Sequence, residues 1–290
     1  MADAAASKAA EATHVGSTPT FPSTTAERPE GDSMSYLLFA SSPWLLPLVM
    51  IVVLGLAIWL PAIGGSALTK TRIPESAWNV VQGGVLTLVA FMLGISFSQS
   101  QARFDARRSL VLTEANAIGT TWLRADQLPA SLERRFRSLL TEYTTTRLQL
   151  YQGDLTPKQI DQGLAKSDAE QAKLWAIATS ALRERSQNLG FSLLMDELNH
   201  TIDVSAEQRN ALTHHVPAAI DGLTLLLVIL GGVLIGLGFA RVGATVPLLG
   251  GAYIVATVMV ITMMIDLDRP QKGLVRVNLE PLVTQLQSMH

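Results

Sequence analysis

The sequence predicts an all-α integral membrane protein: four membrane-spanning helices in two hairpins, with a helical cytoplasmic insert between spans two and three. Three observations support this class. Apolar residues make up 48% of the 290 and are concentrated in two pairs of long runs near the ends of the chain. Only 16% of the residues are charged, which is few for a soluble domain of this length. The segment between the two pairs is polar and has helical periodicity.

Each apolar run is long enough to cross a bilayer core, which takes about 20 residues of helix. The expected spans are 43–63, 79–99, 219–240 and 244–266. Only the tripeptide 241–243 separates the last two, so they should form a tight antiparallel hairpin. Gly232 and Gly236 form a GxxxG motif in span three, which favours close helix packing. The alternative is two buried hairpins of a soluble protein, and runs of this length argue against it.

These spans divide the chain into five expected segments. They are a disordered tail at 1–40, a first transmembrane hairpin at 41–100, a cytoplasmic helical domain at 101–218, a second hairpin at 219–266 and a cytoplasmic tail at 267–290. The N-terminal tail is rich in Ala, Ser, Thr, Pro and Glu, a composition that cannot bury a core. The first apolar run of the chain begins after this tail, too far from the N-terminus for a secretory signal.

Basic residues that flank the spans predict the orientation. Eight of them lie on the side of both termini and the insert, and only Lys70, Arg72 and Arg241 lie on the other side. Because basic flanks stay in the cytoplasm, we expect both termini and the insert there.

Composition and motifs exclude several classes of function. The net charge is −2, which argues against nucleic acid as a partner. There is no cysteine, so disulfides and thiolate chemistry are excluded. The sequence contains no phosphate-binding loop, paired-histidine zinc motif or nucleophile elbow. We therefore expect no catalytic residue, no metal site and no cofactor.

The insert is expected to be helical throughout. No proline occurs between Ala102 and Pro129, so span two should continue as one long helix beyond the membrane. Thr156 followed by Pro157 predicts the N-terminal cap and first turn of a later helix.

Span two is the most informative element. On a helix that turns about 100° per residue, Thr87, Phe91 and Ile95 follow one side, and Ser98 and Asp105 continue near it. This side either packs within the helix bundle or forms a hydrophobic constriction followed by a polar vestibule. Helical spacing alone is compatible with both interpretations.

Four polar residues interrupt an otherwise apolar helix of the insert: Glu114, Asn116, Arg124 and Asp126. Glu114 and Arg124 are too far apart on one helix to pair with each other. Each therefore needs a partner on another helix or subunit. We interpret the four as structural bonds or subunit contacts, with a ligand site as the alternative.

One motif and two longer blocks carry a family resemblance. The motif is FMLGI at 91–95 followed by RF at 103–104, and the blocks are 103–129 and 266–282. The motif resembles the second-span signature of bestrophins, and the blocks are similar to those of the bacterial bestrophin-like family, uncharacterised integral membrane proteins related to bestrophin anion channels. The resemblance extends over about 40–285.

The resemblance implies a bacterial inner-membrane protein surrounded by the lipid bilayer, and a homo-oligomer, namely a pentamer. Bestrophins are anion channels in which the second span lines the pore, so it also implies chloride or another anion as the permeant ion. The implied pore-lining and neck residues are Thr87, Phe91, Ile95 and Ser98. The implied vestibule residues are Arg103, Asp105 and Arg108.

The sequence departs from the bestrophin pattern in two places. Thr87 stands where bestrophins have a bulky apolar residue, which predicts a wider or wetter neck. The acidic cluster that binds calcium in animal bestrophins is missing after span four, so no calcium gating is expected. We assign Asp266, Asp268 and Arg269 to structural or subunit contacts. Asp105 would repel anions, against the implied selectivity.

The sequence therefore favours an oligomeric bestrophin-like ion channel, anion-conducting, with an apolar neck on span two, and not an enzyme. The alternative is a non-conducting membrane scaffold or sensor whose cytoplasmic helical domain binds a protein partner. Oligomeric state distinguishes the two, because a monomer or dimer cannot build a five-fold pore.

Overall fold

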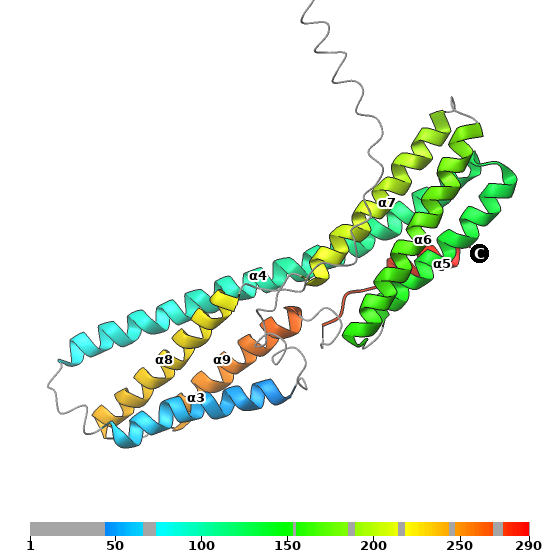
Figure 1. The fold of residues 1–290 in the computed structure, drawn as a ribbon. Helices are drawn as coiled ribbons and strands as arrows, with labels where there is room; N and C mark the ends of the chain where they lie inside the picture. Colours follow the sequence, from blue (N-terminus) through cyan, green and yellow to red (C-terminus); the bar gives the residue numbers. More distant parts are fainter. Residues whose placement is uncertain are drawn as a thin grey trace, which may run out of the picture. The chain divides into compact units, whose positions relative to one another are not determined.

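The computed structural model of the chain describes residues 44–65, 74–152, 155–184, 189–213, 218–243, 247–268 and 275–289. Every regular element in these ranges is a helix (Figure 1). The prediction of an all-α protein is therefore confirmed. The expected N-terminal tail at 1–40 and Arg269 lie outside the described residues.

Four helices of the described chain are long and apolar enough to cross a membrane. They are α3 (Leu45–Gly64), α4 (Glu75–Arg124), α8 (Ala218–Val242) and α9 (Pro247–Asp268). The prediction of four spans in two pairs, before and after a long insert, is confirmed. The expected ends of spans one, three and four agree with the helices to within a few residues.

Helix α4 is continuous over 50 residues. Pro74 precedes its first turn and accepts a hydrogen bond at its carbonyl from the Trp78 backbone N–H (3.1 Å). A 3₁₀ turn, η3 (Ala125–Gln127), follows α4 just before Pro129, which disfavours helix at the residue before it. At about 1.5 Å per residue α4 is roughly 75 Å long, more than twice a hydrocarbon core of about 30 Å.

Four further helices form most of the insert and the C-terminal segment. They are α5 (Ala130–Gln152), α6 (Pro157–Glu184), α7 (Leu189–Thr213) and α10 (Glu280–Ser288). The predicted cap of α6 is confirmed. Thr156 Oγ1 accepts from the Gln159 N–H (3.4 Å), and Gln159 Oε1 accepts from the Thr156 N–H (2.8 Å). This reciprocal pair satisfies two backbone donors at the helix start.

The chain folds into two compact units. Among the described residues, the membrane unit holds those from 44 to 112 and from 206 to 279. The insert unit holds those from 113 to 205 and from 280 to 289. The division falls within α4 and within α7, so both helices contribute residues to each unit. The segment boundaries expected from hydropathy, at 100 and 218, mark the exit from the membrane and stay a prediction.

In the membrane unit, α3 packs against α8 and α9. The buried core draws one or two residues from each of the four spans: Met50, Leu54, Val89, Val228 and Val258. A hydrogen bond from the Tyr253 hydroxyl to the Val228 carbonyl (2.7 Å) adds a polar contact between α9 and α8.

The insert unit has its own apolar core. Its fully buried residues come from α4, α5, α6, α7 and α10: Ile118, Phe136, Leu140, Leu174, Leu194, Leu198 and Leu282. Because α10 contributes Leu282, the C-terminal helix is part of this core although it follows the last span in sequence.

Helices α3 and α8 approach closely at Gly236, where a methyl group would overlap the backbone of Ile58. We expect Gly236→Ala to destabilise the protein by about 1–3 kcal/mol, the usual cost of overpacking. The measurement is the thermal unfolding midpoint in detergent, followed by tryptophan fluorescence. Gly222→Ala is the matched control, because nothing lies within 4 Å of a methyl group there. Equal midpoints for the two variants would contradict the packing assignment.

Candidate functional site

One side of α4 is left uncovered along the membrane unit. Eight exposed residues recur on it at intervals of three and four: Val80, Gly84, Thr87, Phe91, Gly94, Ser98, Ala102 and Asp105. Because an α-helix turns about 100° per residue, they lie within a sector of roughly 80°. We call these eight residues the α4 stripe. Methyl groups added at Gly84 and Gly94 would meet nothing within 4 Å, so this side of the helix is open in the single chain.

The opposite side of α4 is buried. Its buried residues within the membrane unit, none above 7% exposed, are Val89, Ser96, Ser100, Arg107 and Val111. The Ser96 and Thr224 hydroxyls share a hydrogen bond (3.2 Å) that joins α4 to α8. Near the start of α4, the Arg241 guanidinium lies 5.0 Å from the centre of the Trp78 ring. Among the described residues of the membrane unit, these contacts of α4 lie on the side opposite the stripe.

The α4 stripe differs in chemistry from the uncovered surface of α3. The exposed large side chains of α3 are all apolar: Leu45, Leu48, Val49, Ile51, Val52, Leu56, Trp59, Leu60 and Ile63. Such a surface suits lipid. The stripe instead carries mostly small or hydroxyl-bearing residues, with Phe91, 62% exposed, as its largest side chain. Because polar groups are costly against hydrocarbon, the stripe suits water or other protein better than lipid.

Three of the four residues implied as pore-lining lie on the stripe: Thr87, Phe91 and Ser98. Ile95 is half-buried, about 40° round the helix from Phe91. The Thr87 hydroxyl donates to the Gly83 carbonyl (2.8 Å), which satisfies its donor within the helix. Phe91 is therefore the bulky apolar group of the stripe, and Ile95 flanks it.

The three residues implied as a vestibule lie on two different sides of α4. Asp105 belongs to the stripe and accepts a hydrogen bond from the Gln101 amide (3.5 Å). Arg108 is also exposed, about 60° farther round. Arg103 instead lies on the packed side, with Nη1 3.9 Å from an Asp268 carboxylate oxygen.

The end of α9 is bonded to this packed side. Arg107 donates to the Leu267 backbone carbonyl, and Asp268 is buried next to the two arginines. Asp266 instead accepts a hydrogen bond from the Val275 backbone N–H (2.9 Å). Asp266 and Asp268 therefore both have partners within the chain, one on the following segment and one on α4.

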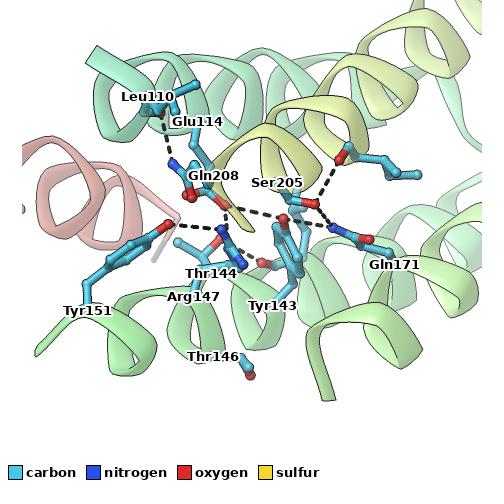
Figure 2. Close-up of polar contacts among 12 residues, drawn as sticks. Leu110, Glu114, Tyr143, Thr144, Thr146, Arg147, Tyr151, Gln171, Ser205 and Gln208 are labelled. Atoms are coloured by element: carbon cyan, nitrogen blue, oxygen red, sulfur yellow. Dashed lines mark hydrogen bonds and ion pairs between the residues drawn. The ribbon is translucent and has the colours of Figure 1, made fainter. Parts of the chain in front are cut away.

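In the insert unit, Glu114 forms a buried ion pair with Arg147 of α5 (Figure 2). Arg147 Nε donates to Glu114 Oε1 at 2.6 Å, and both side chains are at most 2% exposed. Arg147 Nη2 also donates to the Tyr151 hydroxyl (3.0 Å). Burial, the largest single influence, lowers the pKa of Arg147, but the Glu114 carboxylate together with the Tyr151 and Tyr143 hydroxyls outweighs it, so the arginine pKa is raised.

A chain of hydrogen bonds extends from this pair to α6 and α7 (Figure 2). The Tyr143 hydroxyl donates to Glu114 Oε1 (3.4 Å), and the Gln171 amide donates to Tyr143 (3.1 Å) and to Ser205 (2.6 Å). Burial, with the nearby carboxylate, raises the pKa of Tyr143 well above its usual range, so the hydroxyl stays protonated. These hydrogen bonds thus link α4, α5, α6 and α7.

The other polar residues expected in this helix occupy different settings. Arg124 donates to Glu197 (3.1 Å) and to the Leu193 carbonyl (2.7 Å), both on α7. Asn116 is exposed, and Asp126 is exposed and accepts a hydrogen bond from the adjacent Gln127 (2.8 Å). Glu114 and Arg124 therefore each have a partner on another helix of the same chain.

Sequence reasoning missed Arg147 and Tyr143, although a signal was present. Arg147 lies four residues after Tyr143 and seven after Leu140, which places all three on the buried side of α5. A charge in register with an apolar stripe requires a buried partner. Within the described ranges, no group of three or more His, Cys, Asp or Glu residues is placed to hold a metal ion.

Four spans and a helical insert define a polytopic α-helical membrane protein. The profile of the Bestrophin-like domain matches residues 49–282. The chain therefore belongs to the Bestrophin-like family.

Solved structures with this fold include bacterial bestrophin homologues. A single-residue variant of the homologue from Klebsiella pneumoniae is 19% identical with a TM-score of 0.62, over 86% of this chain and 98% of that one. A second variant is 17% identical with a TM-score of 0.63, over 84% and 96%. A crystal structure described as a membrane protein is 18% identical, with a TM-score of 0.60 over 84% and 95%. At these identities the likeness shows the fold. No curated protein matches the chain.

The buried ion pair can be tested by Glu114→Gln, which leaves the Arg147 charge without its carboxylate. We expect a loss of about 3–5 kcal/mol in the free energy of unfolding, as for other broken buried pairs. Glu133→Gln is the matched control, because its pair with Arg137 (3.0 Å) is partly exposed and should contribute less than about 1 kcal/mol.

The double variant Glu114→Gln/Arg147→Met removes both charges and should recover much of the loss. Thermal and denaturant unfolding in detergent measure the stability of the wild type, the two single variants and the double variant. Equal stability of the two single variants would contradict the importance of the buried pair.

Proposed function

We propose that the protein is a homo-oligomeric ion channel of the bestrophin type, with its pore lined by α4. The observation that carries this proposal is the α4 stripe, which is uncovered, small and partly polar on a membrane-spanning helix. Identical copies around a common axis would turn each stripe toward a shared water-filled space. The chain would keep its apolar α3 surface toward lipid.

The neck of this pore would be formed by Phe91. Its ring is the largest side chain of the stripe and stands 62% exposed, between Thr87 and Ser98. A ring of phenylalanines narrows the path and disfavours water, which is how hydrophobic constrictions control conduction. Ile95 would line the same region from the side.

The family resemblance extends the proposal to a pentamer that conducts anions such as chloride. It also favours transport over catalysis as the activity. The family resemblance supports a bacterial inner-membrane location, and the positive flanks of the spans support an orientation with both termini and the insert in the cytoplasm.

A second candidate function is a non-conducting scaffold or sensor. Leu123 and Leu189 of the insert unit favour it, because they are 70% and 76% exposed and could contact a protein partner. Oligomeric state distinguishes the two functions. A monomer or dimer in mild detergent would support the scaffold, since α4 could not then enclose a pore.

We expect Phe91→Ala to raise ion flux from liposomes severalfold, because it removes apolar bulk from the neck. The measurement is chloride and potassium efflux from vesicles that contain equal amounts of purified protein. Phe97→Ala is the matched control. Phe97 is on the same helix and 36% exposed, but lies about 120° from Phe91.

Flux that rises equally in both variants would argue against Phe91 as the constriction. If all three proteins are inserted and oligomeric yet none conducts, the scaffold function replaces the channel.

The cytoplasmic orientation can be tested by cysteine labelling, because the chain has no cysteine of its own. In intact spheroplasts we expect Ser131→Cys in α5 to be protected from a membrane-impermeant maleimide, and Val242→Cys at the end of α8 to react. Both positions are exposed in the chain. The reverse labelling pattern would overturn the proposed orientation.

A further inference from the structure

The charged residues at the end of the α4 stripe bear on which ions the pore favours. Within one and a half turns α4 carries Arg103, Asp105, Arg107 and Arg108. Counted along the sequence, this cluster is positive and suits an anion channel. The structure places its charges on different sides of the helix.

Two of the three arginines face away from the stripe. Arg103 lies near the Asp268 carboxylate (3.9 Å), and Arg107 donates to the Leu267 carbonyl and is 7% exposed. Asp268, itself 4% exposed, offsets part of their positive charge. Both arginines contact the end of α9 on the packed side, so their charge acts on the stripe only across the width of the helix.

Asp105 is the charge that lies on the stripe itself. Its carboxylate is exposed, and within the described chain its bond partner is the neutral amide of Gln101 (3.5 Å). It follows Phe91 by fourteen residues, or roughly 21 Å along the helix. That distance places it beyond the constriction, on the side toward the insert.

Arg108 is the remaining counter-charge. It is exposed but lies about 60° round the helix from Asp105, toward the edge of the uncovered side. In a ring of copies, the Asp105 carboxylates would point toward the axis and the Arg108 guanidinium groups would point between neighbouring helices.

We propose that Asp105 is a selectivity-determining residue that makes the pore favour small monovalent cations, such as potassium, over chloride. This inference rests on the proposed channel function, and it replaces the anion implied by the family resemblance with a small cation as the permeant ion. A ring of carboxylates at a pore mouth raises the local concentration of cations and lowers that of anions. Because the Debye length is about 8 Å at physiological salt, the effect is local and strongest in dilute salt.

The test is the reversal potential of the purified protein in planar bilayers under a potassium chloride gradient, at low and at high salt. We expect the wild type to favour potassium. Asp105→Asn should lower the potassium-to-chloride permeability ratio roughly tenfold, the change that about 1.4 kcal/mol produces. Arg108→Gln should shift the ratio the other way. Asp196→Asn, an exposed carboxylate on α7, is the matched control and should leave the ratio unchanged.

The possible outcomes separate this inference from the function on which it rests. A ratio that falls in Asp105→Asn but not in Asp196→Asn supports Asp105 as the selectivity residue. A conducting wild type whose ratio does not respond to Asp105→Asn overturns the inference and leaves the channel standing. Absence of any current from inserted, oligomeric wild type overturns both. Asp105 is exposed and its replacement isosteric, so elution as the same oligomer confirms that the variant is folded.

Discussion

Hydrocarbon does not solvate polar side chains, and this constraint determines which surfaces of the membrane unit can meet lipid. Helix α3 satisfies it with an exposed surface of large apolar residues. Helix α4 satisfies it less well, because the part of its uncovered stripe within the expected span is mostly small and includes the hydroxyls of Thr87 and Ser98 beside two glycines. The chain alone therefore leaves one surface that is less suited to lipid than the surface of α3. The proposed oligomer, which would enclose the stripe, accounts for this surface.

Helix α4 is held by polar bonds on the side opposite the stripe. Ser96 bonds to α8 and Arg107 to the end of α9, while farther along Glu114 pairs with Arg147 of α5. Each of these contacts buries a polar group, which is tolerable only because its partner is fixed by helix packing. Both units thus bind α4 through buried polar contacts. The opposite side stays free for contacts outside the chain.

Much of the fold could be predicted from the sequence, because the patterns that indicate it lie within single segments of the chain. Hydropathy over about 20 residues indicates a span, whatever the span packs against. The absence of proline between Glu75 and Pro129 predicts a single long helix, and Thr156 before Pro157 predicts the start of α6. The glycines of span three indicated close packing, although the partner of Gly236, the Ile58 backbone, could not be named from the pattern.

The sequence by itself determined the four spans, the long α4 and the face that carries Thr87, Phe91 and Ser98, because hydropathy and helical period are properties of consecutive residues. The tertiary structure decided which charged residues of α4 contact other helices and which stay exposed. Arg103 and Asp105 are two residues apart, yet one lies near Asp268 and the other stands exposed on the stripe. The pairing of Glu114 with Arg147, 33 residues apart, was equally beyond the sequence. Both depend on which helices meet, and a helical period describes only one helix.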